Sequence, residues 1–129
     1  MTLVVEIPGL PPVACSPNAR VHWAVRARAA QAWGETCFYK AVDTRNRSGD
    51  PSQWKNLEGA TLRVTYVVKD NRRRDTDNMD AANKSGIDAL VRANILADDC
   101  HQKLNREKSR FEVDPKRGPA TIVEITCDR

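Results

Sequence analysis

The chain of 129 residues has no long apolar run and few aromatic residues. No segment approaches the roughly 20 consecutive apolar residues that a membrane-spanning helix needs. Residues 1–12 carry no basic segment ahead of their short apolar stretch, so they do not resemble a secretory signal peptide. These absences predict a cytoplasmic protein without a membrane partner. Because aromatic residues make up 5% of the chain, its core must consist mostly of Val, Ile, Leu and Ala.

The sequence also lacks cysteines at close spacing. Its four cysteines are scattered at Cys15, Cys37, Cys100 and Cys127. Two disulfides would suit an exported protein, but without a signal sequence we expect reduced thiols. A structural zinc site is also disfavoured, because its ligands usually come in tight pairs.

Hydrophobic residues make up 40% of the chain, which is enough to build a core. At this length we expect one domain over residues 1–129. Apolar residues at period two predict strands, and apolar residues at helical spacing predict helices. The expected strands cover 2–7, 60–69, 108–113 and 120–126, the expected helices cover 21–42 and 77–92, and a polar loop covers 44–56. This order has no regular βαβ rhythm, which favours an α+β domain with a small mixed sheet packed against two main helices.

Charge is unevenly distributed along the chain. Between Asp75 and Asp99 there are six acidic and two basic residues, whereas the remainder carries 19 basic and 11 acidic residues. A basic protein around one acidic segment suits the binding of a polyanion close to metal ions. An ordinary solvated surface with one acidic helix explains the same distribution. The charge pattern alone leaves both interpretations open.

Two acidic residues stand at the expected start of the second helix. Asp75 and Asp77 are two positions apart, and in an extended segment this spacing directs both carboxylates to one side. The alternative is structural, since Asp77 or Thr76 is a suitable residue to cap the helix. A lone Asp at this place would favour the capping role.

Further charged residues follow along the same helix. Lys84 comes seven positions after Asp77, and Asp88 comes one turn later, so a continuous helix brings all three to nearly one face. The alternative is that Asp80, Lys84 and Asp88 form exposed ion pairs four residues apart, each of which stabilises little.

A third acidic element, Asp98 and Asp99, follows the helix after a short apolar run. If that run forms a strand beside the end of the strand at 60–69, this pair meets the two earlier acids, Asp75 and Asp77. Carboxylates so close repel one another unless a divalent cation neutralises them, and oxygen ligands favour Mg²⁺ or Mn²⁺. Such a site activates water and stabilises phosphate charge in phosphodiester hydrolysis, with a nearby lysine as a fixed positive charge.

At these positions the chain resembles the RusA family of Holliday-junction endonucleases, which bacteria, prophages and phages encode. The family pattern is Asp-x-Asp-Asn, then a Lys, an (I/F/L)DAL-like segment and an Asp-Asp pair. The corresponding residues here are Asp75-Thr76-Asp77-Asn78, Lys84, Ile87-Asp88-Ala89-Leu90 and Asp98-Asp99. The opening loop and first helix are also similar, at Pro17-Asn18, Arg20, His22 and Trp23. One departure is that the Lys follows the Asn by six positions, whereas the shortest family version has it after three, where this chain has Ala81.

The resemblance implies a Mg²⁺-dependent endonuclease, with Mn²⁺ as a possible substitute, that resolves four-way DNA junctions by paired symmetric nicks in recombination and repair. It assigns as metal ligands Asp75, Asp77 and Asp99, with Asp98 nearby and Lys84 assisting catalysis. It also implies a RusA-like fold and a homodimer, because two symmetric nicks need two sites related by a twofold axis.

Basic residues near the acidic segment are the expected DNA contacts: Arg72, Arg73, Arg74, Lys103 and Arg106. A run of arginines is otherwise a solvated surface. Trp54, in the polar loop, is a candidate for stacking on an exposed base, and His22 and His101 are candidates for phosphate contact or for packing. Two other functions stay open, namely a nucleic-acid-binding module without cleavage and a nuclease that acts on other branched DNA or on RNA.

Overall fold

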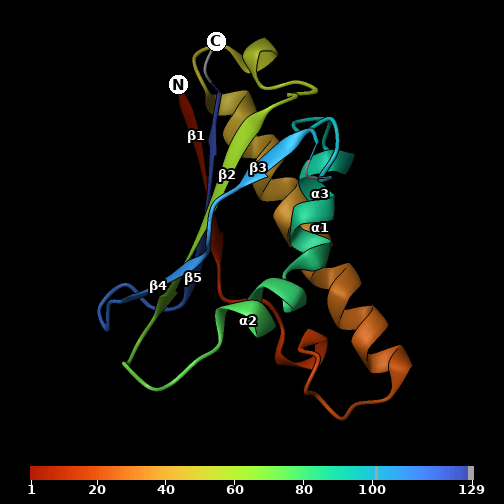
Figure 1. Cartoon of the computed structure of the whole chain (residues 1–129), viewed down its shortest axis with the longest axis vertical. Coiled ribbons are helices and arrows are strands. Elements are labelled where there is room, and N and C mark those ends of the chain that lie inside the picture. The colour runs from red at the N-terminus through yellow and green to blue at the C-terminus, as the bar shows by residue number, and fades with distance from the viewer. Residues whose placement is uncertain (101, 128–129) are drawn as a thin grey trace.

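The structure is a computed structural model that describes residues 1–100 and 102–127 (Figure 1). In this part of the chain five strands form one sheet, accompanied by three α-helices and two short 3-10 helices. The elements are β1 (Thr2–Pro8), η1 (Val13–Cys15), α1 (Trp23–Arg47), η2 (Pro51–Gln53), β2 (Ala60–Val68), α2 (Thr76–Ala82), α3 (Lys84–Arg92), β3 (Leu104–Arg106), β4 (Arg110–Val113) and β5 (Ala120–Thr126). The predicted α+β class is confirmed. Among these described helices, none combines the length and the apolar character that crossing a bilayer requires.

Strand β2 is the centre of the sheet. It pairs antiparallel with β5 on one side, and on the other side it pairs parallel first with β3 and then with β4. Strand β5 also pairs antiparallel with β1, from Thr2 opposite Thr126 to Pro8 opposite Ala120. The sheet is therefore mixed, as predicted. Strand β3 was not predicted, because only one of its three residues, Leu104, is buried.

The core lies between one face of the sheet and the two longer helices. Figure 1 shows α1 and α3 together on that face, with α2 near the lower half of the sheet. Alternate residues of the strands point toward the helices, as the period of two predicts. The buried core includes Leu3, Val5 and Ile7 of β1, Leu62, Val64 and Tyr66 of β2, Trp33, Cys37 and Ala41 of α1, and Ile87 and Leu90 of α3.

Helix α1 is longer than its apolar pattern predicts. It ends at Arg47 rather than at residue 42. Its last turns are held by polar contacts, since the Thr44 hydroxyl donates to the Lys40 carbonyl at 2.7 Å and the Arg45 guanidinium donates to the Ala93 carbonyl at 2.6 Å. The helix therefore continues over polar residues that the sequence pattern assigned to a loop.

The tryptophans occupy very different environments. Trp54 is 4% exposed and belongs to the same core as Leu57 and Leu96. The prediction that it stacks on an exposed base is therefore wrong. Trp33 is also buried, whereas Trp23, at the start of α1, is exposed over three quarters of its surface.

Candidate functional site

The first acidic residue of the motif begins α2. Asp75 is the N-cap, and its Oδ1 accepts the backbone N–H of Asp77 at 2.8 Å. The prediction that Asp77 or Thr76 is the cap is therefore wrong. Asp77 already lies in the first helical turn, so the two carboxylates do not share one extended segment as predicted. Both side chains are exposed.

The predicted second helix is interrupted at Asn83, which separates α2 from α3. The N–H of this residue is shared between the carbonyls of Met79 and Asp80, at 3.0 and 3.1 Å. Its side-chain oxygen accepts the indole N–H of Trp33 at 2.8 Å, and Asn83 is only 1% exposed. A buried polar group needs such a partner, so this contact stabilises the interruption. Lys84 therefore starts a new helix, and the rotation argument that put it on the face of Asp77 does not hold.

Asp80 makes contacts with the core that the sequence did not predict. Its Oδ1 accepts the Tyr66 hydroxyl and the Ser109 hydroxyl, both at 2.6 Å. Tyr66 is completely buried and Ser109 nearly so. Burial and the hydrogen bond to Asp80 raise the pKa of Tyr66 far above its ordinary value, while a hydrogen bond from Asn83 acts in the opposite direction. Asp80 was weighed only as an exposed partner of Lys84, and that expectation is wrong.

A sequence signal for this contact did exist. The pattern of alternate apolar residues in the strand at 60–69 places Tyr66 on the buried face, and a buried tyrosine hydroxyl usually finds a polar partner. The acceptor had to come from another element, and Asp80 is a short distance further along the chain. Ser109, the second donor, directly precedes β4.

Asp80 lies in a hollow with three further charged residues. The hollow has a volume of about 330 Å³, and its lining includes Asp80, Lys84, Asp99 and Arg106. Lys84 is also 3.6 Å from Asp88, an exposed pair four residues apart, as one of the alternatives proposed. The structure therefore brings together Lys84 and Asp99, two residues of the predicted site.

Asp99 reaches this hollow by a route that differs from the predicted one. Leu96 makes a parallel bridge to Leu57, ahead of the start of β2, and not beside the end of the strand near Lys69. This return strand was therefore wrongly placed. Asp98 uses its Oδ1 to accept the backbone N–H of Asp99 at 2.7 Å.

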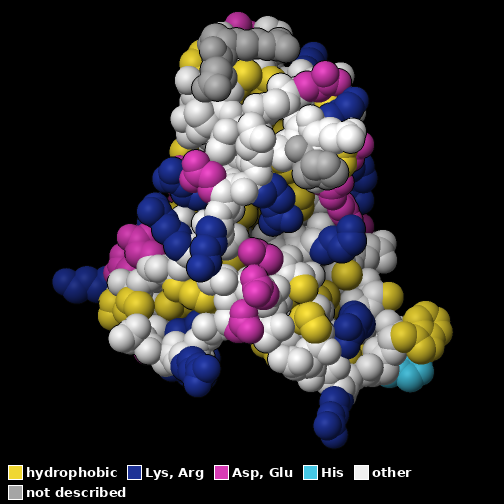
Figure 2. All heavy atoms as spheres, in the orientation of Figure 1, with side chains coloured by type: hydrophobic (Ala, Val, Ile, Leu, Met, Phe, Trp, Pro, Cys, Tyr) yellow, Lys and Arg dark blue, Asp and Glu magenta, His cyan; other side chains and the backbone are white. Residues whose placement is uncertain are grey.

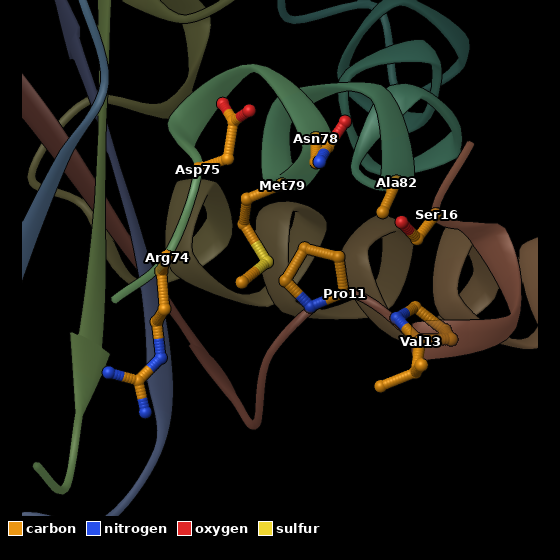
Figure 3. A pocket seen from close by; sticks show the side chains of 9 residues that line it. Pro11, Val13, Ser16, Arg74, Asp75, Asn78, Met79 and Ala82 are labelled. Atoms are coloured by element: carbon orange, nitrogen blue, oxygen red, sulfur yellow. The ribbon is translucent and has the colours of Figure 1, made fainter. Parts of the chain in front are cut away.

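Asp75 lies beside two other hollows. One is polar and is lined by Arg73, Arg74, Asp75, Thr76 and Asn78. The other is apolar, has a volume of about 210 Å³ and is formed largely by Pro11, Pro12, Val13 and Met79. In Figure 3 the Met79 side chain reaches toward Pro11, whereas the Asp75 carboxylate points away from Pro11.

A divalent cation would have to be held by fewer than three of the described side chains. Within residues 1–100 and 102–127, no group of three or more His, Cys, Asp or Glu side chains is arranged to bind a metal ion. Mg²⁺, however, commonly uses one or two carboxylates and takes its remaining ligands from water and phosphate. Asp80 and Asp99 fit that donor set, and Figure 2 shows acidic side chains in a column over the region of α2, with Lys and Arg side chains on both sides.

The predicted DNA contacts differ in their freedom to bind phosphate. Arg74 donates to the Asp70 carboxylate at 2.9 Å, and the Arg72 guanidinium is 3.9 Å from the same group. The pKa of Asp70 is lowered by its hydrogen bonds with Arg72 and Arg74. Lys103 pairs with Glu58 at 3.1 Å, and this hydrogen bond raises the pKa of Lys103.

The other candidate phosphate contacts lie in different environments. Arg73 is exposed, and Arg106 lines the hollow of Asp80. His22 caps α1, where its Nδ1 accepts the Ala24 N–H at 3.2 Å. His101 lies outside the described residues.

No family model matches the chain, and no curated protein matches it. Two features of the chain itself therefore indicate a function: the order of the acidic motif in the sequence, and the hollow lined by Asp80, Lys84, Asp99 and Arg106.

Proposed function

We propose that the protein is a Mg²⁺-dependent, structure-selective DNA endonuclease of the RusA kind, which resolves four-way junctions by paired nicks. The observation that carries this proposal is the shared hollow of Lys84 and Asp99. These residues belong to the motif that resembles the RusA family, and they come from separate parts of the chain. Arg106 adds a second positive charge at the same place.

The proposal gives a chemical role to Lys84, Asp99 and Arg106 in the hollow and to the two acids at the start of α2, which do not line it. Lys84 and Arg106 bind a DNA phosphate and offset the negative charge that develops on it during hydrolysis. Asp99, with Asp75 and Asp77 at the start of α2, supplies carboxylate oxygens for Mg²⁺ or Mn²⁺. A bound Mg²⁺ supplies an activated water and a Lewis acid for phosphodiester hydrolysis. When no DNA is bound, Asp88 is the partner of Lys84.

The surface around the acidic segment supports a role in DNA binding. Arg73 is exposed. The ion pair of Arg72 with Asp70 is long, at 3.9 Å, and exposed, so it is weak. A DNA phosphate can therefore bind to either arginine. Resolution of a junction requires two active sites in a symmetric arrangement, and a twofold homodimer provides them. The homodimer is therefore part of the proposal.

The decisive experiment incubates the protein with a labelled four-way junction, with and without Mg²⁺. We expect Mg²⁺-dependent cleavage, and we expect Asp77→Asn to abolish it while DNA binding survives, because Asn keeps the shape and removes the charge. Asp43→Asn is the matched control, since Asp43 is an exposed helical acid on α1 that pairs with Arg47.

Two outcomes distinguish the alternatives. A protein that binds the junction and never cuts it is a nucleic-acid-binding module, in which Asp75 serves as a helix cap. Cleavage of flaps or RNA in preference to the junction identifies a nuclease of another specificity. On a supercoiled cruciform plasmid, direct linearisation supports a dimer with paired nicks, whereas accumulation of nicked circles contradicts it.

A further inference from the structure

The family-like motif does not include Asp80, yet no other acid of the hollow is so firmly held by the core. We propose that Asp80 is a further functional carboxylate of the site, which shares the divalent cation with Asp99 and is oriented by Tyr66 and Ser109. This inference rests on the proposed function and deepens it, because it adds a residue to the cation site and names the residues that position it.

The Asp80 carboxylate is held by hydrogen bonds from buried side chains. Two hydroxyl groups donate to a single oxygen, Oδ1, at 2.6 Å each. Both donors are buried, and they come from different strands or their borders, so the carboxylate cannot rotate without breaking a buried hydrogen bond. With Oδ1 committed to these donors, Oδ2 is the oxygen available to a ligand. Carboxylates that bind metal ions are typically held by hydrogen bonds of this kind from neighbouring groups.

Asp80 is connected to the core through more than its direct hydrogen-bond partners. Asn83 lies close enough to Tyr66 to lower the pKa of the Tyr66 hydroxyl, and the side-chain oxygen of Asn83 accepts the Trp33 indole N–H. This series of contacts connects α1, the interruption between α2 and α3, and β2. Asp80 is therefore fixed relative to the core, whereas Asp75 and Asp77 are exposed at the start of a helix.

Asp80 lies near the other acids of the proposed site. Asp80 comes three residues after Asp77 on α2, and residues at this spacing are neighbours on a helix surface. It also lines the hollow of Asp99, Lys84 and Arg106. Asp80 thus lies between the acids at the start of α2 and the acid that follows α3. Lys84 and Arg106 in the hollow can bind a DNA phosphate, and Mg²⁺ commonly completes its coordination with phosphate oxygens.

The bland explanation is that Asp80 serves only as the acceptor for two buried hydroxyl groups. It predicts that changes at Asp80 alter stability alone. The two explanations differ in cation binding, which is measurable without DNA.

The experiment measures binding of Mn²⁺ alone, by electron paramagnetic resonance, to the full chain. We expect Asp80→Asn to weaken Mn²⁺ binding by about tenfold or more, while Asp43→Asn changes it by less than about twofold, as expected for an exposed acid of α1 that pairs with Arg47 and does not line the hollow. Asn keeps the side-chain oxygen that accepts from Tyr66 and Ser109, so Asp80→Asn should fold, and near-ultraviolet circular dichroism checks this.

A second variant tests the positioning role of Tyr66. Tyr66→Phe keeps the ring and removes the donor, so we expect the Mg²⁺ concentration for half-maximal junction cleavage to rise by about tenfold, while the rate at saturating Mg²⁺ approaches that of the parent. A merely structural role would lower the melting temperature and leave the Mg²⁺ requirement unchanged.

The outcomes separate this inference from the proposed function. If the parent cuts the junction and Asp80→Asn retains both the parental Mn²⁺ affinity and the parental Mg²⁺ requirement, the inference is overturned and the endonuclease proposal stands. If the parent binds Mn²⁺ through Asp80 and cuts no DNA, the endonuclease proposal fails and the cation site stands. A parent that binds no Mn²⁺ overturns the inference.

Discussion

Two acidic residues of the same short helix, Asp75 and Asp80, are held in opposite ways. Asp75 is exposed and makes its hydrogen bond to the backbone of its own helix. Asp80 is bound by side chains of the buried core. An acid held by the local backbone can be replaced by any good capping residue, whereas an acid held by the core depends on residues distant in the sequence. On the proposed function, the catalytic role of the acids at the start of α2 is thus separable from folding, whereas that of Asp80 is coupled to folding.

The strongest way to break this comparison is to disturb the packing beneath Asp80. In Gly86→Ala, the new Cβ would lie 2.3 Å from Asn83 Oδ1 and 2.9 Å from Trp33 Nε1. Overpacking and damage to the Trp33–Asn83 hydrogen bond should lower the free energy of unfolding by roughly 3 kcal/mol. Urea denaturation measures this change.

The matched control is Gly49→Ala, where the added Cβ meets no atom within 4 Å and the backbone is not left-handed. This control should change stability by less than about 1 kcal/mol. Equal stabilities of Gly86→Ala and Gly49→Ala would contradict the close packing around Asn83.

A second test uses the pH dependence that Tyr66 introduces. Burial and the bond to Asp80 raise its pKa in the folded state, so above pH ~10 the unfolded chain releases a proton that the folded chain retains. The stabilisation is complete below about pH 10 and decreases above it by about 1.4 kcal/mol per pH unit.

Tyr66→Phe should remove the part of the alkaline decrease that Tyr66 causes and cost about 1 kcal/mol at neutral pH, through loss of the hydrogen bond. The part due to the buried Cys37 thiol, whose pKa burial raises to about 12, should remain. Urea denaturation from pH 7 to 11 compares it with the parent and with Tyr39→Phe, which changes an exposed ring. If the free energy of unfolding changes with pH in the same way in the parent and in Tyr66→Phe, folding does not raise the pKa of Tyr66.

The smallest effect is expected at the cap. Asp75→Ala removes the acceptor for the Asp77 N–H and should cost about 1 kcal/mol in thermal or urea unfolding, whereas Asp75→Asn retains capping and should be nearly neutral. On the proposed function both variants lose cleavage. If Asp75→Asn destabilises as much as Asp75→Ala, the charge rather than the cap supports this helix.

Local patterns predicted most of the fold. The strands at 2–7, 60–69 and 120–126 were predicted from their apolar pattern, and the structure places them within one residue of those bounds. The helix at 77–92 was recognised, but its interruption was not, because the contact that stabilises Asn83 comes from Trp33 in another helix. A periodicity argument has no access to such a distant contact.

The candidate site was predicted only in part, because contacts from distant elements also shape it. Lys84 and Asp99 were chosen from the motif, and they share a hollow. Asp80 was passed over because an acid four residues before a lysine on a helix is usually an exposed pair. Its actual partners, Tyr66 and Ser109, belong to or border strands, and their approach depends on the parallel pairing of β2 with β4.

Strand β5 separates β1 from β2, and the first and last strands of the chain are neighbours, as Figure 1 shows at the adjacent N and C labels. During synthesis both β1 and β2 therefore lack their shared partner until residues 120–126 have left the ribosome. Such long sequence separation between paired strands slows folding. A circular permutant with a short linker from β5 to β1 would turn this most distant pairing into a local hairpin, and it should reach the native state faster than the parent chain.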